Sequence, residues 1–241
     1  MVITSLENQK VKDVVKLQSK KYRDITDTFV IETSNLVEEA EKAGIVKDLF
    51  LVEDEFVDNE DVYFVTKEVM KKMSSLDSPS NVLAVCKKSN SKDILGNRIL
   101  LLDNIQDPGN LGTIIKSSVA FNVDTIVLSL DTVDLYNPKV IRASEGMFFH
   151  INIVIMDLEK AIDIIKKRDI TIYGTNVNNG DDVRNIENKS SYALIIGNEG
   201  NGVKPNIQKL CDKNLYIPMR NNCESLNVGV ACSILLYELG R

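Results

Sequence analysis

The sequence predicts an α/β fold in two domains, the larger one built on a mainly parallel sheet. After about residue 99, short apolar runs alternate with segments of helical character, which is typical of parallel strands covered on both faces. Before residue 90 the alternation is shorter, and a polar segment that contains a glycine, residues 87–98, separates the two patterns. The predicted domains are therefore 1–90 and 99–241, with a linker at 91–98. A chain of 241 residues that is 44% hydrophobic and 27% charged can bury two cores of this kind.

The first domain begins with a basic amphipathic segment. Residues 7–20 have apolar residues at helical spacing (Val11, Val14, Val15 and Leu17), so we predict one helix there. The elements predicted after it are strands at 29–32, 48–52, 62–65 and 82–86, and helices at 35–43 and 67–73.

The second domain has longer elements and ends with a very apolar helix. Its predicted strands are 99–103, 124–128, 152–155, 170–175, 192–197 and 215–219, and its helices are 110–121, 137–144, 158–168, 203–210 and 228–239. The last helix is apolar almost all round, which predicts a buried helix with Ser225 or Asn227 as its N-cap. Ligands on sheets of this kind bind beyond the carboxyl ends of the strands.

Composition excludes several classes of protein. No run of about eighteen apolar residues and no signal-like segment is present, so we expect a cytoplasmic protein with no membrane span. The four cysteines show no metal-ligand spacing, which predicts reduced thiols and no metal site. The single histidine, His150, excludes a multi-histidine metal site, and its two preceding phenylalanines favour a packed or half-buried structural role.

The charge is unevenly distributed along the chain. A net charge of −6 disfavours indiscriminate binding to nucleic acid. Residues 1–23, however, carry six basic side chains against two acidic ones, which leaves +4, and residues 48–61 carry seven acidic side chains and no basic one. This asymmetry indicates one phosphate-facing side, although a solvated helix face explains it about as well.

Polar residues and glycines gather at the carboxyl ends of three predicted strands. They occupy residues 103–116, 195–203 and 225–227, and none of them matches a dinucleotide fingerprint or a P-loop. Each alone is typical of a turn. Together, at one edge of one sheet, they predict a ligand pocket.

These segments carry a resemblance to a known family. DPGNLGTIIK (107–116), NPKVIRASEGMFFH (137–150), IIGNEGNGV (195–203) and IPM…ESLNVGVACSILLYE (217–238) occur in an order that resembles the SpoU (TrmH-like) branch of the SPOUT RNA methyltransferases. The resemblance covers about residues 99–239. The N-terminal part is similar to the L30e-like substrate-binding domain, although Thr33 stands where a glycine commonly follows the glutamate.

The resemblance implies a fold and an activity. It implies a deep trefoil knot in the C-terminal domain, a homodimer formed through that domain, and S-adenosylmethionine as cofactor. The implied reaction is methyl transfer to a ribose 2′-hydroxyl of RNA, with ribosomal RNA as the leading substrate and transfer RNA as the alternative. No metal or membrane takes part in such a reaction.

The resemblance also implies roles for particular residues. The implied catalytic residues are Asn110, Lys116, Glu199, Ser225 and Asn227. The implied cofactor-binding residues are Thr175, Gly197, Ile217 and Leu226. Arg142 is implied to face the RNA, and the basic segment adds Lys10, Lys12, Lys20, Lys21 and Arg23 as candidate RNA ligands.

Lys116 departs from the family pattern, which generally has arginine at this position. Lysine keeps the charge but loses the bidentate fork. A ribose hydroxyl is a poor nucleophile, so the site must orient it and accept its proton. Two hypotheses follow: Lys116 with its pKa lowered by desolvation takes the proton, or Lys116 clamps a phosphate of the substrate.

Two other functions compete with methyl transfer. One is an RNA-binding protein that has lost catalysis, which Lys116 and Glu145 favour and the other four polar residues oppose. The other is a dinucleotide-dependent enzyme on a doubly wound sheet, which the missing glycine fingerprint disfavours.

Overall fold

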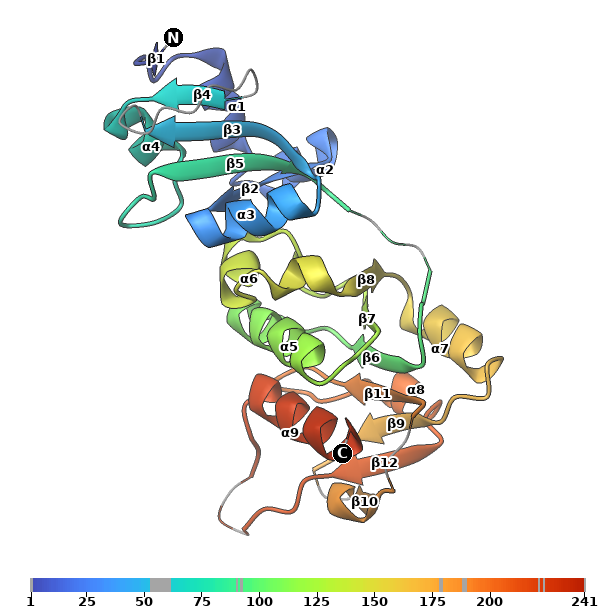
Figure 1. Ribbon diagram of the computed structural model, residues 1–241. Coiled ribbons are helices and arrows are strands. Elements are labelled where there is room, and N and C mark those ends of the chain that lie inside the picture. The colour runs from blue at the N-terminus through green and yellow to red at the C-terminus, as the bar shows by residue number, and fades with distance from the viewer. Residues whose placement is uncertain are drawn as a thin grey trace. The chain divides into compact units, whose positions relative to one another are not determined.

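The computed structural model describes residues 2–52, 62–89, 91, 93–177, 180–187, 190–220, 222 and 224–240 (Figure 1). Most of the acidic stretch noted in the sequence, residues 53–61, and Cys223 lie outside the described residues. By its internal contacts the chain divides into two compact units, one of residues 1–89 with 136–142 and one of residues 90–135 with 143–241.

The first unit contains a mixed five-stranded sheet in the order β1-β4-β3-β5-β2. The strands are β1 (Val2–Ile3), β2 (Thr28–Glu32), β3 (Val46–Val52), β4 (Val62–Val65) and β5 (Val82–Lys87). The helices are α1 (Gln9–Lys16), α2 (Lys20–Thr26), α3 (Ser34–Lys42) and α4 (Lys67–Met73). The core forms where Val11, Val14 and Leu17 pack against β3, β4, β5 and α4, so these three predicted apolar positions are buried.

The prediction of one helix over residues 7–20 is wrong, because two helices occupy this region. α1 ends at Lys16, and α2 begins at Lys20. The Arg23 guanidinium donates hydrogen bonds to the carbonyl oxygens of Leu17 and Gln18, at 2.7 and 2.9 Å. Carbonyl groups at a helix end have no partner inside the helix, and Arg23 supplies one.

The second unit is built on seven strands in the order β10-β12-β9-β11-β6-β7-β8, and every neighbouring pair is parallel. The strands are β6 (Arg98–Leu102), β7 (Thr125–Leu128), β8 (Asn152–Ile155), β9 (Ile172–Thr175), β10 (Asp181–Asp182), β11 (Tyr192–Ile196) and β12 (Lys213–Tyr216). The predicted parallel α/β architecture is confirmed. The two-residue strands β1 and β10 are too short to produce a periodic signal in the sequence.

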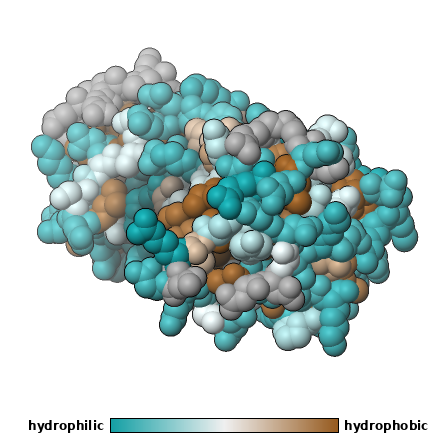
Figure 2. Space-filling view, turned by 90° about the horizontal axis from the view of Figure 1, so that it is seen from below, coloured by the Kyte–Doolittle hydropathy of each residue, from teal (hydrophilic) through white to brown (hydrophobic). Residues whose placement is uncertain are grey.

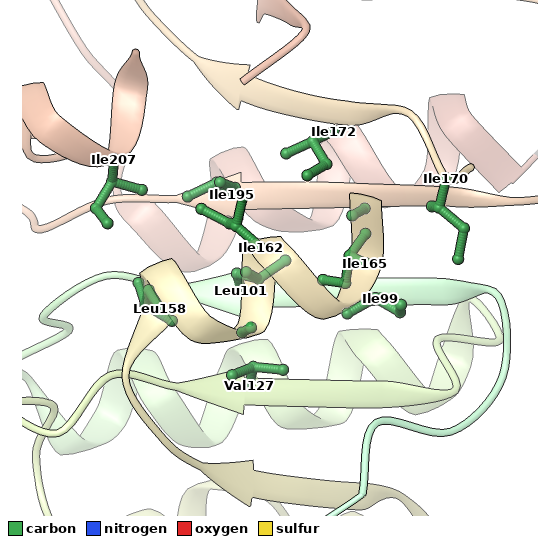
Figure 3. Packing of buried hydrophobic residues seen from close by; sticks show 12 residues of the cluster. Ile99, Leu101, Val127, Leu158, Ile162, Ile165, Ile170, Ile172, Ile195 and Ile207 are labelled. Carbon is green, nitrogen blue, oxygen red and sulfur yellow. The ribbon is translucent and has the colours of Figure 1, made fainter. Parts of the chain in front are cut away.

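Helices cover both faces of this sheet. They are α5 (Pro108–Ala120), α7 (Leu158–Lys166), α8 (Pro205–Gln208) and α9 (Val228–Gly240), with 3₁₀ turns η1 (Met147–His150) and η2 (Val183–Asn185), while most of α6 (Pro138–Ala143) groups with the first unit. Figure 3 shows Leu158, Ile162 and Ile165 of α7 directed onto the strands, with other helices behind the sheet. α5 and α9 pack against each other.

The prediction that the last helix is buried is only partly right. α9 buries Val228, Cys232 and Leu236, but Val230 and Tyr237 are 47% and 54% exposed. One side of the apolar helix α9 is therefore not covered by the rest of the chain. None of the helices described by the structure is long and apolar enough to cross a membrane.

Candidate functional site

Glu199 lies at the centre of a hydrogen-bonded cluster that joins three distant segments. It follows β11, and its carboxylate accepts hydrogen bonds from the backbone N–H of Gln106 at 3.3 Å, the N–H of Asp107 at 3.1 Å and Nδ2 of Asn110 at 3.1 Å. Burial would raise the pKa of Glu199, but hydrogen bonds from Asn110 and from the backbone outweigh it and hold this pKa below its ordinary value. Glu199 is therefore ionised at neutral pH.

Asn110 connects Glu199 to the start of the last helix. It lies in the first turn of α5, which Asp107 caps by accepting a hydrogen bond from the Asn110 N–H at 2.8 Å. Asn110 Oδ1 accepts a hydrogen bond from Asn227 Nδ2 at 2.9 Å. Asn227 Oδ1 accepts from the N–H groups of Gly229 and Val230, as an N-cap does, so its side chain has a fixed orientation.

Lys116 and Ser225, the two other catalytic candidates, are close in sequence to members of this cluster. Lys116 is six residues beyond Asn110 on α5, which separates the two by about 9 Å along the helix axis. Its ammonium forms an ion pair with Glu145 at 2.7 Å, and the Lys116 side chain is 49% exposed. Ser225 is exposed in the segment that leads to Asn227.

Thr175, Gly197 and Ile217, three of the four cofactor-binding candidates, lie at the carboxyl edge of neighbouring strands. β12, β9 and β11 are adjacent, and Thr175 at the end of β9 pairs with Leu215 of β12. Gly197 and Ile217 follow β11 and β12 at the same edge, and Ile217 and Leu226 are both half-buried. Thr175 Oγ1 donates a hydrogen bond to the carbonyl oxygen of Ile195 at 3.0 Å, which ties β9 to β11.

Gly197 is required by the close approach of the loop that follows it. A Cβ atom at this position would lie 2.1 Å from the Gly202 carbonyl carbon and 2.1 Å from the Val203 nitrogen. No side chain tolerates such a contact with backbone, so the loop from 197 to 203 folds back against its own first residue only because residue 197 is glycine.

The basic candidates of the first unit differ in their surroundings. Lys10 pairs with Asp48 at 2.7 Å and lies over the Tyr63 ring, and Lys12 pairs with Glu7 at 2.7 Å. Lys20 and Lys21 are exposed, and Lys21 lies over the Tyr22 ring. Arg142 donates a hydrogen bond to Ser75 Oγ at 2.9 Å.

Arg23 is different because it is only 3% exposed. Its guanidinium is used to hold the junction of α1 and α2, so this placement does not support Arg23 as an RNA ligand. His150 also differs from expectation: it is exposed at the end of η1, and the interpretation of a packed histidine is wrong.

A cleft of about 370 Å³ lies at the carboxyl ends of β6, β7 and β8. It is lined by Asp103, Asp131, Asp157, Glu159, Lys204 and Asn206, among others. This cleft is not the pocket that the three polar segments predict, because only Asp103 of those segments lines it and Glu199 and Asn227 do not. Among the residues that the structure describes, no group of three or more potential ligands is arranged to hold a metal, and Cys86, Cys211 and Cys232 are free thiols.

Sequence reasoning missed three residues that contact the candidates. Gln106 and Asp107 supply backbone donors to Glu199, and Glu145 pairs with Lys116. Gln106 and Asp107 lie within the polar segment 103–116, which was the only available signal. Nothing in the sequence connects Glu145 to Lys116, because the two are 29 positions apart.

Comparison with known proteins identifies the family. Residues 97–237 match the SpoU rRNA Methylase family, and residues 8–84 match the MRM3-like substrate binding domain. The 23S rRNA (guanosine(2553)-2′-O)-methyltransferase RlmP of Bacillus subtilis (strain 168) is 41% identical over 98% of both chains.

Solved structures give the same assignment. A crystal structure of an rRNA methyltransferase from Sinorhizobium meliloti superposes with a TM-score of 0.90 at 29% identity, covering 99% of this chain and 96% of that one. A crystal structure of AdoMet-bound rRNA methyltransferase from the same organism gives 0.88 at 30% identity, covering 99% and 97%. The chain belongs to the SpoU rRNA methylase family, and the resemblance seen in the sequence is confirmed.

Proposed function

We propose that this protein transfers a methyl group from S-adenosylmethionine to a ribose 2′-hydroxyl of 23S ribosomal RNA. Family membership and the RlmP relative, which matches along nearly its whole length, support the reaction and the RNA class. The guanosine named for that relative is the first nucleotide to examine. The observation that carries the proposal is the hydrogen-bonded series Glu199–Asn110–Asn227, which joins three of the family's polar positions.

This series supports a site that orients its reactants. Ionised Glu199 fixes the Asn110 amide, and Asn110 fixes the Asn227 amide. The amide orientations are therefore set before a substrate arrives. Ser225, exposed just before Asn227, adds a hydroxyl to the same segment.

The residues around the strand ends fit a bound adenosine. Ile217 and Leu226 are half-buried apolar side chains. Thr175 ends β9, the neighbour of β12, and Gly197 follows β11, the strand beyond β9. Small and apolar groups of this kind form a wall for a flat base, while nearby backbone groups supply hydrogen bonds. When bound there, S-adenosylmethionine supplies an electrophilic methyl group. A deep trefoil knot in this part of the chain is included in the proposal.

We assign Lys116 the role of phosphate clamp. Its side chain is half exposed, and its ammonium already meets a carboxylate, so it is placed to meet an anion from the solvent side. A phosphate oxygen can replace the Glu145 carboxylate as partner of the ammonium.

The first unit is proposed to grip the RNA and the second to act on it, with the division at residues 1–90, 91–98 and 99–241. The match to a substrate binding domain over residues 8–84 supports this assignment. Lys10, Lys12, Lys20 and Lys21 on α1 and α2, together with Arg142, are the proposed phosphate ligands. The uncovered apolar side of α9 supports a homodimer formed through the second unit.

The test combines binding with product mapping. Calorimetric titration with S-adenosylmethionine is expected to give saturable binding, and tritiated methyl transfer to 23S rRNA from a host that lacks the gene is expected to label one ribose. The control is 23S rRNA from the host that retains the gene, which should accept no label because its ribose is already methylated.

Two other results would change the conclusion. If only transfer RNA is labelled, transfer RNA rather than 23S rRNA is the substrate. If S-adenosylmethionine does not bind, the protein is not a methyltransferase, and the RNA-binding interpretation takes its place.

A further inference from the structure

The loop that carries Glu199 is closed on itself. The N–H of Asn198 donates to the Gly202 carbonyl at 3.0 Å, and the N–H of Gly202 donates to the Asn198 carbonyl at 2.9 Å. Inside this ring, the Asn198 side chain accepts from the N–H groups of Gly200 and Asn201. A closed loop of this kind moves as one body, so the position of Glu199 depends on what holds the two ends of the loop.

Asp103 holds both ends. At the start of the loop, the Asp103 N–H donates to the carbonyl of Ile196 at 2.8 Å. At its end, Asp103 Oδ2 accepts the Lys204 N–H at 2.8 Å. Asp103 is 1% exposed, and a carboxylate so buried is costly unless it is paired.

Lys204 supplies that pairing and extends it to a second carboxylate. Its ammonium lies 3.1 Å from Asp103 Oδ1 and 2.7 Å from Asp131 Oδ2. The hydrogen bond to Asp131 raises the pKa of Lys204 despite partial desolvation, so the ammonium stays charged. We call Asp103, Lys204 and Asp131 the clasp.

The clasp also reaches the groups that donate to Glu199. The Asp131 carbonyl accepts a hydrogen bond from Gln106 Nε2 at 2.8 Å, and the Gln106 backbone N–H donates to Glu199. A parallel route runs through Asn198 Nδ2, which donates to the Asn104 carbonyl at 2.8 Å. The three residues of the clasp thus hold the ends of the loop that carries Glu199, and they also hold Gln106, which donates a hydrogen bond to Glu199.

We propose that Asp103 and Lys204 are positioning residues that set the place of Glu199 against Asn110. The inference rests on the proposed function, because the consequence for turnover needs Glu199 in the methyl-transfer site. Neither residue touches the cluster directly. Their effect passes through the two ends of the Glu199 loop and through Gln106.

The decisive variant is Lys204→Met. This variant keeps the backbone N–H that donates a hydrogen bond to Asp103. It removes the ammonium, so the buried Asp103 carboxylate loses its countercharge. We expect kcat for 23S rRNA to fall about tenfold with KM for RNA nearly unchanged, since displacements of about 1 Å in a site cost up to about 100-fold. Lys204→Arg keeps the charge and should recover most of kcat.

A double-mutant cycle separates positioning from general destabilisation. In a Glu199→Gln background, Lys204→Met should lower kcat much less than in the wild type, because its effect passes through Glu199. Asn206→Ala is the matched control. Asn206 lies in the same cleft, but its side chain donates to Glu159 of α7 rather than to the loop, so kcat should not change.

Hydrogen exchange gives a readout that does not depend on activity. The amides of Gly200 and Asn201 should exchange faster in Lys204→Met and in Asp103→Asn than in Asn206→Ala. Equal losses of kcat in both backgrounds, or unchanged exchange in the loop, would overturn the inference. If the wild-type protein transfers no methyl group, the proposed function fails, and the exchange experiment still decides whether the clasp fixes the loop.

Discussion

Thr33 carries a backbone conformation that threonine rarely adopts. Its φ and ψ are 91° and 141°, and a β-branched residue at positive φ is strained by about 1–3 kcal/mol. By the family resemblance, Thr33 stands where a glycine is expected after the glutamate, and it makes no side-chain cap bond to α3. The physical demand at this position is therefore for a residue without Cβ.

We expect Thr33→Gly to raise the free energy of unfolding by about 1 kcal/mol, after the larger entropy of glycine in the unfolded chain is subtracted. Urea denaturation measures the change. Thr66→Gly is the matched control, because Thr66 caps α4 at an ordinary φ of −72° and accepts from the Val69 N–H. That variant should be destabilised, and a loss of stability in both variants would contradict strain at Thr33.

In the second unit, substitutions of Lys116 test its proposed role as a phosphate clamp. If the ammonium binds a phosphate, Lys116→Arg should keep kcat and lower KM for RNA, because arginine adds a bidentate fork. Lys116→Met should raise KM for RNA about tenfold or more, since the charge that meets the phosphate is gone. Steady-state kinetics at two salt concentrations measure both effects. If turnover by Lys116→Arg instead collapses while KM stays the same, the base role is supported and the clamp is contradicted.

Glu199 should make stability depend on pH. Its pKa in the folded protein lies below the ordinary value of 4.5, so its hydrogen bonds contribute fully above that pH and are lost as the pH falls through the folded-state pKa. We expect Glu199→Gln to unfold at lower urea than the wild type at pH 7, with the difference shrinking below pH 4.5. A difference that stays constant down to pH 3 would contradict this.

At the scale of elements, helices and strands were predictable where the hydrophobic pattern was clear and bounded by breaks. The bounds of β4, β8 and α4 were predicted to the residue, because each is a short apolar or amphipathic run between clear breaks. The break between α1 and α2 was not predicted. The apolar spacing continues to Leu17, and the bond that ends α1 comes from Arg23, whose charge had indicated RNA contact.

The candidate site was predictable only in part, because a residue pattern does not show which distant side chains meet. Residue pattern alone placed three polar segments at one edge of a sheet. It could not tell which side chains meet, because Asn110 is 89 positions from Glu199 and 117 from Asn227. The family resemblance named these residues, and the contacts that orient them come from the fold.

Gly197 makes the loop after β11 sensitive to a single methyl group. We expect Gly197→Ala to lower the free energy of unfolding by about 2–3 kcal/mol, because the new Cβ meets the backbone of Gly202 and Val203. Gly200→Ala is the control in the same loop. Its Cβ would have an ordinary contact of 3.6 Å with Asn198 Oδ1, so its stability should change little. Thermal unfolding of the two variants makes the comparison, and equal destabilisation would contradict a specific clash.

At the scale of the whole molecule, the exposed side of α9 is the feature that a single chain does not account for. Figure 2 shows one face of the molecule, on which some hydrophobic residues reach the surface among mostly hydrophilic ones. On α9 the exposed apolar side chains are Val230 and Tyr237. Apolar area left open on a helix that is otherwise buried is typical of a protein interface. A homodimer with two-fold symmetry would cover the same patch on both copies.

We expect Val230→Lys to convert the proposed dimer to a monomer, because a lysine at the centre of an apolar interface must give up its hydration without a partner. Sedimentation velocity at micromolar concentration measures the change. Ile164→Lys is the matched control: Ile164 is 40% exposed on α7, which covers the other face of the sheet, and Val230 is 47% exposed on α9. A wild-type protein that sediments as a monomer would contradict the dimer, and dissociation by both variants would mean that the interface lies elsewhere or is broader than α9.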